Sequence, residues 1–413
     1  MSRLLLISPE AGYLTVPFQL AGERLGIEVV VASEGHHPLV PRRSTGLQVT
    51  FSDPVQTVAV IKEYHQKKRF DGVIATDDSV SELASIVAIA LGLPSNPPEC
   101  VKIGLRKDFS REAQKASGLR TPWFLSLRLD REKGLSIPNG VAYPCIVKPV
   151  TLSASRGVIR ANNQEELASA LTRISRIINL AGPRHPLVCL IEEYIPGEEY
   201  AVEGFLEKGR WHTIAIFSKP DPMEGPFFEE TIYIVPAGLS CGRETELIGT
   251  VGQTCKAIGL VHGPVHAECR INDKGTWLIE LSPRPIGGRC GRILESSTGK
   301  ALADMIISNA LGQSQSISLT TETKGVMMIP VPGSGILRRV EGIQKARSID
   351  HVEEVEIDVR PGQRMIPWPE GSSYPGFIFA KGKNTEIVIK ALKSAHHELN
   401  FILAPELPIV MGK

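Results

Sequence analysis

The sequence predicts an α/β protein of several domains, with a parallel sheet at its N-terminal end and a mixed β/α region at its C-terminal end. Residues 1–98 alternate strand patterns with amphipathic helical patterns, which is typical of βαβ units. Residues 264–281 contain two strand patterns around a short turn, which predicts a β-hairpin. The length of 413 residues is enough for two to four domains of ordinary size.

The first domain is predicted to cover residues 1–98. Its three strands are the apolar runs RLLLIS, EVVVAS and FDGVIAT, and the helices between and after them are expected at 16–26, 53–68 and 79–92. The last helix ends at Gly92, with Pro94 shortly after it, and the Pro-rich segment LPSNPPEC closes the unit. This order of elements predicts a Rossmann-like parallel sheet.

The second domain is predicted over 99–312, with a smaller lobe at about 120–197. It opens with one helix over 99–118, which ends at a glycine. The buried strand YPCIVKPV follows, then the small-residue loop TLSASRGV, then a helix that begins at the cap-like Asn163. A further strand leads to a hinge at Pro196-Gly197.

The larger lobe of the second domain is predicted over about 198–312. A pair of strands is followed by a long ordered loop over 219–242 and a helix over 244–259. The hairpin and a helix near 295–311 complete the lobe. Residues 313–413 are predicted to form a third domain, a mixed β/α cap.

Composition excludes several classes of partner. The 46 basic and 45 acidic residues give no electrostatic reason to expect nucleic acid or a membrane surface as a partner. No apolar run reaches the roughly 18–20 residues of a spanning helix, and the N-terminus does not resemble a signal peptide. The seven cysteines form no CxxC pair, so we expect reduced thiols in a cytoplasmic protein and no structural zinc.

The hairpin contains two glutamates that we expect to face each other. A loop over 273–275 would pair residue 272 with 276, and therefore Glu268 with Glu280, at a Cβ separation of roughly 4.5–5.5 Å. Two like charges in apolar surroundings repel, and a divalent cation would resolve the conflict. Magnesium is commonly held by one or two carboxylates plus substrate phosphates. The alternatives are that the pair faces solvent or that one glutamate is neutral.

Three basic residues are candidates for binding anions. Arg284 follows the hairpin between two prolines, where it would suit a phosphate or a developing anion, or else form a surface salt bridge. Lys148 ends a buried strand and needs an anionic partner. Lys107 lies on a predicted helix, where most lysines are simply solvated.

Two loops carry further signals for a nucleotide. The segment Ser153–Gly157 offers hydroxyl groups, backbone N–H groups and a glycine, so it could close over phosphates or be a plain turn. The hinge in EEYIPGEEY has backbone groups that could read an adenine edge. Glu199 could accept hydrogen bonds from ribose hydroxyls, although an acid at a strand end more often faces solvent.

Taken in order along the chain, these pieces resemble the ATP-grasp superfamily. They are the helix with Lys107, the strand with Lys148, the small-residue loop, EEYIPGEEY, and HAECRI followed by WLIELSPRPIGG. The resemblance covers nearly the whole chain. The segment KPDPMEGPFFEETIYIVPAGL, over 219–239, resembles the carboxylate–amine ligase branch that includes L-amino acid (dipeptide) ligases and carnosine synthase.

The resemblance implies an ATP-grasp fold with two lobes that bind ATP, and a role for each matching residue. Lys107 and Lys148 would contact the ATP phosphates, and Ser153, Ser155 and Gly157 would belong to a mobile flap. The implied adenine and ribose contacts are Glu192, Tyr194, Ile195 and Glu199. The implied metal ligands are Glu268, Glu280 and, in place of the asparagine of many relatives, Ser282. Arg284 would stabilise the acyl phosphate and the tetrahedral intermediate, and Gly287, Gly288 and Arg289 would border the carboxylate substrate.

The reaction implied by the resemblance has two steps. A substrate carboxylate attacks the γ-phosphate of ATP to give an acyl phosphate and ADP, and an amine then displaces phosphate to give an amide. The cofactors would be ATP with Mg²⁺, or Mn²⁺ as an alternative. The substrates would be a small carboxylate and an amine, both expected to be amino acids, and a homodimer is left open. His266, on the Glu268 face, is a candidate substrate-binding residue and base, and a structural histidine is the alternative.

Two other functions remain open from the sequence. One is another ATP-grasp reaction, such as a biotin-carboxylase-like carboxylation or a formate-dependent transformylation. The other is a nucleotide-binding module without catalysis. The presence of Lys107, Lys148, both hairpin glutamates and Arg284 favours an enzyme over a module.

Overall fold

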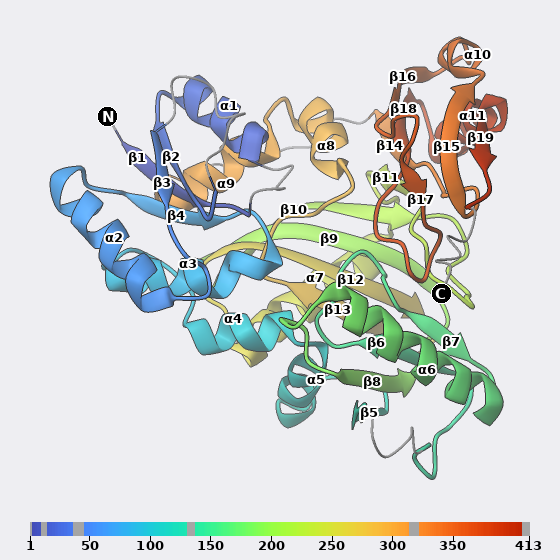
Figure 1. The fold of residues 1–413 in the computed structure, drawn as a ribbon, viewed down its shortest axis with the longest axis horizontal. Helices are drawn as coiled ribbons and strands as arrows, with labels where there is room; N and C mark the ends of the chain where they lie inside the picture. Colours follow the sequence, from blue (N-terminus) through green and yellow to red (C-terminus); the bar gives the residue numbers. More distant parts are fainter. Residues whose placement is uncertain (1, 10–14, 36–44, 130–136, 314–321, 407–413) are drawn as a thin grey trace, which may run out of the picture. The chain divides into compact units, whose positions relative to one another are not determined.

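The computed structural model describes residues 2–9, 15–35, 45–129, 137–313 and 322–406 (Figure 1). The chain divides into two compact units, each built from separate segments. Unit 1 is formed by Met1–Thr121, Tyr200–Ile216 and Gly238–Thr320, and unit 2 by Pro122–Glu199, Phe217–Ala237 and Thr321–Lys413. The three-domain division made from the sequence stays a prediction. No helix within the described ranges has the length and apolar character needed to cross a membrane.

Unit 1 begins with the parallel sheet that the sequence predicts. Its strands are β1 (Arg3–Ile7), β2 (Glu28–Ser33), β3 (Thr45–Gln48) and β4 (Gly72–Ala75), in the order β3-β2-β1-β4, and each neighbouring pair is parallel. The helices α1 (Thr15–Leu25), α2 (Pro54–Lys67) and α3 (Asp78–Ala90) alternate with them (Figure 1). Residues 4–7 of the central strand are fully buried, as a strand covered on both faces requires. Strand β3 was not predicted, because TGLQ contains one bulky apolar residue.

Local capping explains where the helices of this sheet begin. Asp53 accepts a hydrogen bond from the Gln56 N–H, and Pro54 occupies the first turn of α2, where its missing N–H costs nothing. Asp77 accepts from the Ser79 N–H at 2.9 Å and caps α3. The first residues of α2 and α3 therefore follow capping residues that can be recognised in the sequence.

The helix predicted over 99–118 is in fact two helices, α4 (Pro98–Leu105) and α5 (Lys107–Ala116). Arg106 between them is extended, with φ −110° and ψ 109°. Its guanidinium pairs with Asp108 at 2.6 Å and lies 4.3 Å from the Phe109 ring centre. Residues two apart do not face each other in a helix, so this pair suits the break. The break makes Lys107 the first residue of α5.

The rest of unit 1 contains the antiparallel strands that carry the hairpin glutamates. These strands are β9 (Glu198–Glu207), β10 (Arg210–Lys219), β12 (Gly263–Asn272) and β13 (Gly275–Ser282), in the order β13-β12-β9-β10. The first two residues of β9 and the last three of β10 belong to unit 2. The helices are α7 (Cys241–Ile258), α8 (Cys290–Thr298) and α9 (Leu302–Ala310). The single helix predicted near 295–311 is thus divided, at Gly299, whose φ of 71° ends α8.

Unit 2 begins with a four-stranded antiparallel sheet. Its strands are β5 (Phe124–Arg128), β6 (Cys145–Pro149), β7 (Ile159–Ala161) and β8 (Val188–Glu193), in the order β5-β8-β6-β7. The helix α6 (Gln164–Ala181) buries Leu167, Leu171, Ile174 and Ile178 against this sheet. Asn163 caps α6 by accepting from the Glu166 N–H at 2.9 Å, and the Glu166 carboxylate accepts in return from Asn162. The sequence predicts this cap.

The C-terminal part of unit 2 is mixed β/α, as predicted. One set of strands is β11 (Ile232–Val235), β14 (Thr323–Met328), β16 (Val352–Ile357) and β18 (Gly376–Gly382), in the order β11-β14-β18-β16. A second sheet has the order β17-β15-β19 and contains β15 (Gly335–Glu341), β17 (Arg364–Met365) and β19 (Asn400–Ala404). The helices are α10 (Ile343–Arg347) and α11 (Thr385–Glu398). The loop predicted over 219–242 therefore contains a strand, β11, whose four residues are all buried.

Candidate active site

The two hairpin glutamates are directly opposed, as the sequence predicts, although the predicted turn is wrong. Asn272 pairs with Gly275, so the turn has two residues and not three. A β-bulge then shifts the register between Glu268 and Cys269, and Glu268 pairs with Glu280. The two deviations cancel, and the pair of carboxylates is retained.

Ile279 is the extra residue of the bulge, and Arg111 contacts its backbone. The Ile279 carbonyl accepts a hydrogen bond from Arg111 Nη2 at 2.8 Å. Arg111 lies on α5 and is 2% exposed, so its guanidinium is held inside unit 1. This bond supplies a donor to the Ile279 carbonyl and so stabilises the bulge beside Glu280.

A lysine lies beside the second glutamate. Lys107 Nζ is 2.9 Å from Glu280 Oε1, and the two side chains are 10% and 26% exposed. The sequence left open whether Lys107 is merely solvated. It is instead largely buried and paired, and it brings positive charge next to the carboxylate pair.

The first glutamate belongs to a buried cluster with His266 and Glu203. His266 Nε2 lies 3.5 Å from Glu268 Oε1, and His266 Nδ1 lies 3.4 Å from Glu203 Oε2. These distances are long for hydrogen bonds. Glu203, on β9, is fully buried and accepts from the Ile286 N–H with both oxygens, at 3.1 and 3.2 Å. It thereby ties β9 to the segment that follows Arg284.

Charge in this cluster favours a protonated histidine. Burial lowers the pKa of His266, but the carboxylates of Glu203 and Glu268 outweigh this effect and raise the pKa to about 9. Burial raises the pKa of Glu203, and His266 and the Ile286 N–H oppose the rise. The raised pKa of His266 favours its protonated form at neutral pH. A protonated imidazole cannot accept a proton at neutral pH, which favours a structural role for His266 over that of a general base.

Arg284 is ion-paired, which was the alternative left open by the sequence. Its Nε donates to Asp78 Oδ2 at 3.0 Å, and Nη1 donates to the Pro285 carbonyl at 2.9 Å. Asp78 is the first residue of α3, and its Oδ1 is buried without a hydrogen-bond partner among the described residues. These two hydrogen bonds fix the orientation of the Arg284 guanidinium.

The remaining predicted residues of unit 1 are close to Arg284 in the sequence. Ser282 is buried and sits opposite His266 in the hairpin. Gly287 accepts from the Cys290 N–H at 3.2 Å, and Gly288 has a φ of 60°. Arg289 precedes α8 with a φ of 58°, the left-handed region that residues with a Cβ rarely adopt.

In unit 2, the buried Lys148 is paired with an anionic side chain, that of Glu192. Lys148 Nζ is 2.6 Å from Glu192 Oε1, and the side chains are 3% and 4% exposed. Ile146 pairs with Glu192 between β6 and β8, so Lys148 lies on the same face, two residues along. The candidate phosphate lysine and the candidate adenine glutamate are therefore in contact.

Glu199 contacts a second buried lysine that the sequence analysis did not single out. Lys219 Nζ is 2.7 Å from Glu199 Oε1 and 2.9 Å from Glu230 Oε1, and lies 5.0 Å from the Tyr233 ring centre. Its side chain is 3% exposed. The missed signal was a lysine at the end of a strand pattern, before the acidic pair at 229–230.

The hinge and the flap loop are also well defined. Arg160 stacks 4.3 Å from the Tyr194 ring centre, and Ile195 is buried. In the flap loop, Ser153 accepts from the Arg156 N–H and Ser155 accepts from the Val158 N–H through their carbonyls. Gly157 has a φ of 77°, and a Cβ there would lie 2.8 Å from Pro149 Cγ, so only glycine fits.

The two hairpin carboxylates suit a magnesium ion whose other ligands come mainly from a bound substrate. The described residues contain no group of three or more histidine, cysteine or acidic side chains placed to hold a metal ion. The opposed pair Glu268 and Glu280 supplies two carboxylates, the number with which Mg²⁺ is commonly bound when phosphates complete its shell. All seven cysteines are free thiols.

Comparison with known proteins identifies the superfamily. Three family models match: the ATP-grasp N-terminal domain over 18–95, the ATP-grasp domain over 141–293 and the L-amino acid ligase C-terminal domain 2 over 327–404. The crystal structure of an L-amino acid ligase from Bacillus licheniformis is 27% identical, with a TM-score of 0.80, and the match covers 98% of this chain and 99% of that one.

Curated relatives belong to the same group. Dapdiamide A synthase from Enterobacter agglomerans is 25% identical over 77% of this chain and 80% of its own length. Carnosine synthase 1 from Gallus gallus is 27% identical over 53% of this chain, and the match spans 25% of that protein. The chain belongs to the ATP-grasp superfamily and, within it, to the carboxylate–amine ligase branch, whose members are enzymes that form C–N bonds.

Proposed function

We propose that this protein is an L-amino acid (dipeptide) ligase that joins two amino acids at the expense of ATP, with release of ADP and phosphate. The observation that carries the proposal is the opposed pair Glu268 and Glu280 with Lys107 beside it. The likeness to the L-amino acid ligase of Bacillus licheniformis over nearly the full chain supports the choice of substrate class.

In the proposed reaction, the substrate carboxylate attacks the γ-phosphorus of ATP and the bond to ADP breaks, which gives an acyl phosphate. The amine then attacks the acyl carbon, the C–O bond to phosphate breaks, and the amine loses a proton. Phosphoryl transfer of this kind depends on positioning and on neutralising charge. Magnesium, when bound, neutralises charge on the phosphate oxygens.

Each group of residues has a part in this proposal. Glu268 and Glu280 would hold magnesium, with Ser282 as a weaker ligand. Lys107, Lys148 and the flap loop of Ser153, Ser155 and Gly157 would bind the phosphates. Glu192, Tyr194 and Ile195 would bind adenine, and Glu199 would bind ribose. Arg284 would stabilise negative charge on the acyl phosphate, beside a carboxylate site bordered by His266, Gly287, Gly288 and Arg289.

The buried pairs of unit 2 suit the binding of a polar ligand such as a nucleotide. Lys148, Glu192 and Glu199 are all less than about a tenth exposed. Electrostatic interactions are stronger in such surroundings than in water. We further propose that the small-molecule partners are two amino acids. The proposed metal is Mg²⁺ or Mn²⁺, and the proposed location of the protein is the cytoplasm.

A phosphate-release screen tests this function. The protein is incubated with ATP, Mg²⁺ and pairs of L-amino acids, and productive mixtures are analysed by mass spectrometry. We expect phosphate release that requires both amino acids and a product whose mass equals their sum minus water. Phosphate release that depends on bicarbonate or formate, and on no amine pair, would contradict the proposal and favour carboxylation or transformylation.

A further inference from the structure

Three hydrogen bonds join the flap loop to a segment more than 200 residues later in the chain. This segment, residues 368–370, is called the latch here, and both parts belong to unit 2. The three bonds run from Trp368 Nε1 to the Ala154 carbonyl at 2.9 Å, from the Gly157 N–H to the Pro369 carbonyl at 2.9 Å, and from Arg156 Nε to the Glu370 carbonyl at 3.0 Å.

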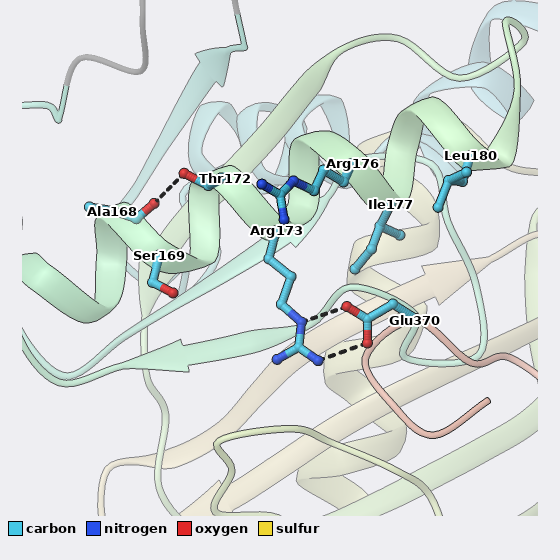
Figure 2. A pocket seen from close by; sticks show the side chains of 8 residues that line it. All are labelled: Ala168, Ser169, Thr172, Arg173, Arg176, Ile177, Leu180 and Glu370. Carbon is cyan, nitrogen blue, oxygen red and sulfur yellow. Dashed lines mark hydrogen bonds and ion pairs between the residues drawn. The ribbon is translucent and has the colours of Figure 1, made fainter. Parts of the chain in front are cut away.

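The latch is anchored at both ends. The Trp368 ring packs in a buried cluster with Val331, Leu337 and Met365, and lies 4.9 Å from the Tyr374 ring. At the other end, the Glu370 carboxylate receives two hydrogen bonds from Arg173 of α6, at 2.5 and 2.8 Å (Figure 2). The flap therefore contacts a segment that is itself fixed to the C-terminal cluster and to α6.

The flap backbone needs such support. Ala154 and Ser155 have φ values of 54° and 53°, in the left-handed region that is unfavourable for residues with a Cβ. Two consecutive residues in this region persist only where surrounding contacts fix them. The latch bonds supply such contacts to Ala154, the first residue of the pair, and to Arg156 and Gly157, which follow it.

The ionic anchor is accessible to solvent and can be released. Arg173 and Glu370 are 40% and 37% exposed, so salt and water compete with their attraction. They border a hollow of about 530 Å³ along α6 (Figure 2), whose other lining residues are Ala168, Ser169, Thr172, Arg176, Ile177 and Leu180. The Trp368 end, by contrast, is 4% exposed and gives the latch its fixed point.

We propose that residues 368–370 are positioning residues that hold the flap ready to bind the ATP phosphates. A preorganised flap loses less conformational freedom when it binds than a free loop would. The role in ATP binding rests on the proposed function, whereas the hold of the latch on the flap can be measured without any substrate.

The direct test is tryptic cleavage after Arg156 in the absence of nucleotide. Trp368→Phe keeps an aromatic ring in the cluster and removes the N–H that donates to Ala154. Loss of this bond should speed cleavage of the Arg156–Gly157 bond by about three- to tenfold, because the loop opens more often. Trp211→Phe is the matched control, since Trp211 Nε1 has no hydrogen-bond partner among the described residues. It should cleave at the wild-type rate.

A charge exchange tests the ionic anchor independently of the tryptophan. Glu370→Arg and Arg173→Glu should each accelerate cleavage after Arg156, and the double exchange should bring the rate back towards wild type. If Trp368→Phe fails to fold, this series of variants still tests whether the latch restrains the flap loop. Unchanged cleavage in Trp368→Phe and in both single exchanges would overturn the latch.

Kinetics then separate positioning from general stability. With an active amino-acid pair, Trp368→Phe should raise the KM for ATP about three- to tenfold and change kcat by less than about twofold. Equal losses of kcat and thermal stability, with an unchanged KM, would contradict a positioning role. If no amino-acid pair supports turnover, the proposed function fails, while the cleavage experiments still decide the latch.

Discussion

Lys148 and Lys219 are the residues that most constrain what unit 2 can bind. Each ammonium is buried and paired with a glutamate, Glu192 or Glu199. Buried ion pairs add little net stability, because desolvation offsets the attraction between the charges. Two such pairs, each formed between two adjacent strands of its own sheet, are therefore better explained by a polar ligand than by folding.

Removal of one partner of the Lys148–Glu192 pair should be more damaging than removal of both. Lys148→Met leaves a buried carboxylate unpaired and should lower the free energy of unfolding by about 3–5 kcal/mol. Lys148→Met combined with Glu192→Leu should recover most of this loss but should not restore ATP binding. Urea unfolding and nucleotide titration measure the two quantities separately, and recovery of both would show that the pair is only structural.

Glu280→Gln should strongly reduce turnover while leaving the fold intact. The amide keeps the size of the side chain and removes the charge that would hold magnesium, so kcat/KM should fall by about 10²–10³-fold. Glu63→Gln, at an exposed carboxylate paired with Lys67, is the control and should have no effect on phosphate release. Wild-type rates in Glu280→Gln would contradict the metal assignment.

Sequence reasoning found most of the residues of the candidate site but did not single out Glu203, Lys219 or Glu230. Glu203 lies within the apolar strand β9, and Lys219 and Glu230 lie in a segment predicted as a loop. The oppositely charged residue that pairs with a buried charge lies on another strand. Its position depends on strand register and sheet topology, which cannot be predicted from the sequence pattern of a single strand.

At the level of elements, the flap loop is built around Gly157. Gly157→Ala combines an unfavourable φ with a clash against Pro149, and should raise the KM for ATP about tenfold by displacing the flap. Gly182→Ala is the matched control, since Gly182 also has a positive φ but no neighbour within 4 Å of an added Cβ. It should lower stability slightly and leave the KM unchanged; the same rise in both variants would rule out a specific effect of the flap.

The hairpin shows that two strands can be located from the sequence although the details of the turn and the bulge cannot. The apolar alternation and Gly275 located both strands, and Glu268 does oppose Glu280. The turn length and the bulge at Ile279 were not predicted from the sequence. The bulge is stabilised by a hydrogen-bond donor, Arg111, which lies on another element. The divided helix at Arg106 was also not predicted, and the Arg106 side chain contacts Asp108 and Phe109 directly after the break.

At the scale of the whole molecule, bound nucleotide should stabilise the fold only with magnesium. Binding at about 100 times Kd adds about 2.7 kcal/mol to the free energy of unfolding. ATP with Mg²⁺ should therefore raise Tm by several degrees, and a chelator should remove most of the shift. A thermal melt measures this, and an equal shift with and without the chelator would contradict a metal-bridged nucleotide.

The order of elements along the chain was largely predictable, and its division into compact units was not. Continuous apolar runs and capping residues predict the parallel sheet and α6, which the structure confirms. Both units, however, combine segments from three parts of the chain. Changes in composition along a chain indicate where domains begin and end. They do not indicate which distant segments pack together.

The most direct test of the central assignment, activation of a carboxylate by phosphoryl transfer, is an isotope transfer. An L-amino acid labelled with ¹⁸O in its carboxylate is incubated with a productive amine partner, ATP and Mg²⁺, and the released phosphate is analysed by mass spectrometry. An acyl phosphate transfers one carboxylate oxygen to phosphorus, so each phosphate should carry one ¹⁸O atom. Unlabelled phosphate, with both ¹⁸O atoms retained in the amino acid, would contradict the account.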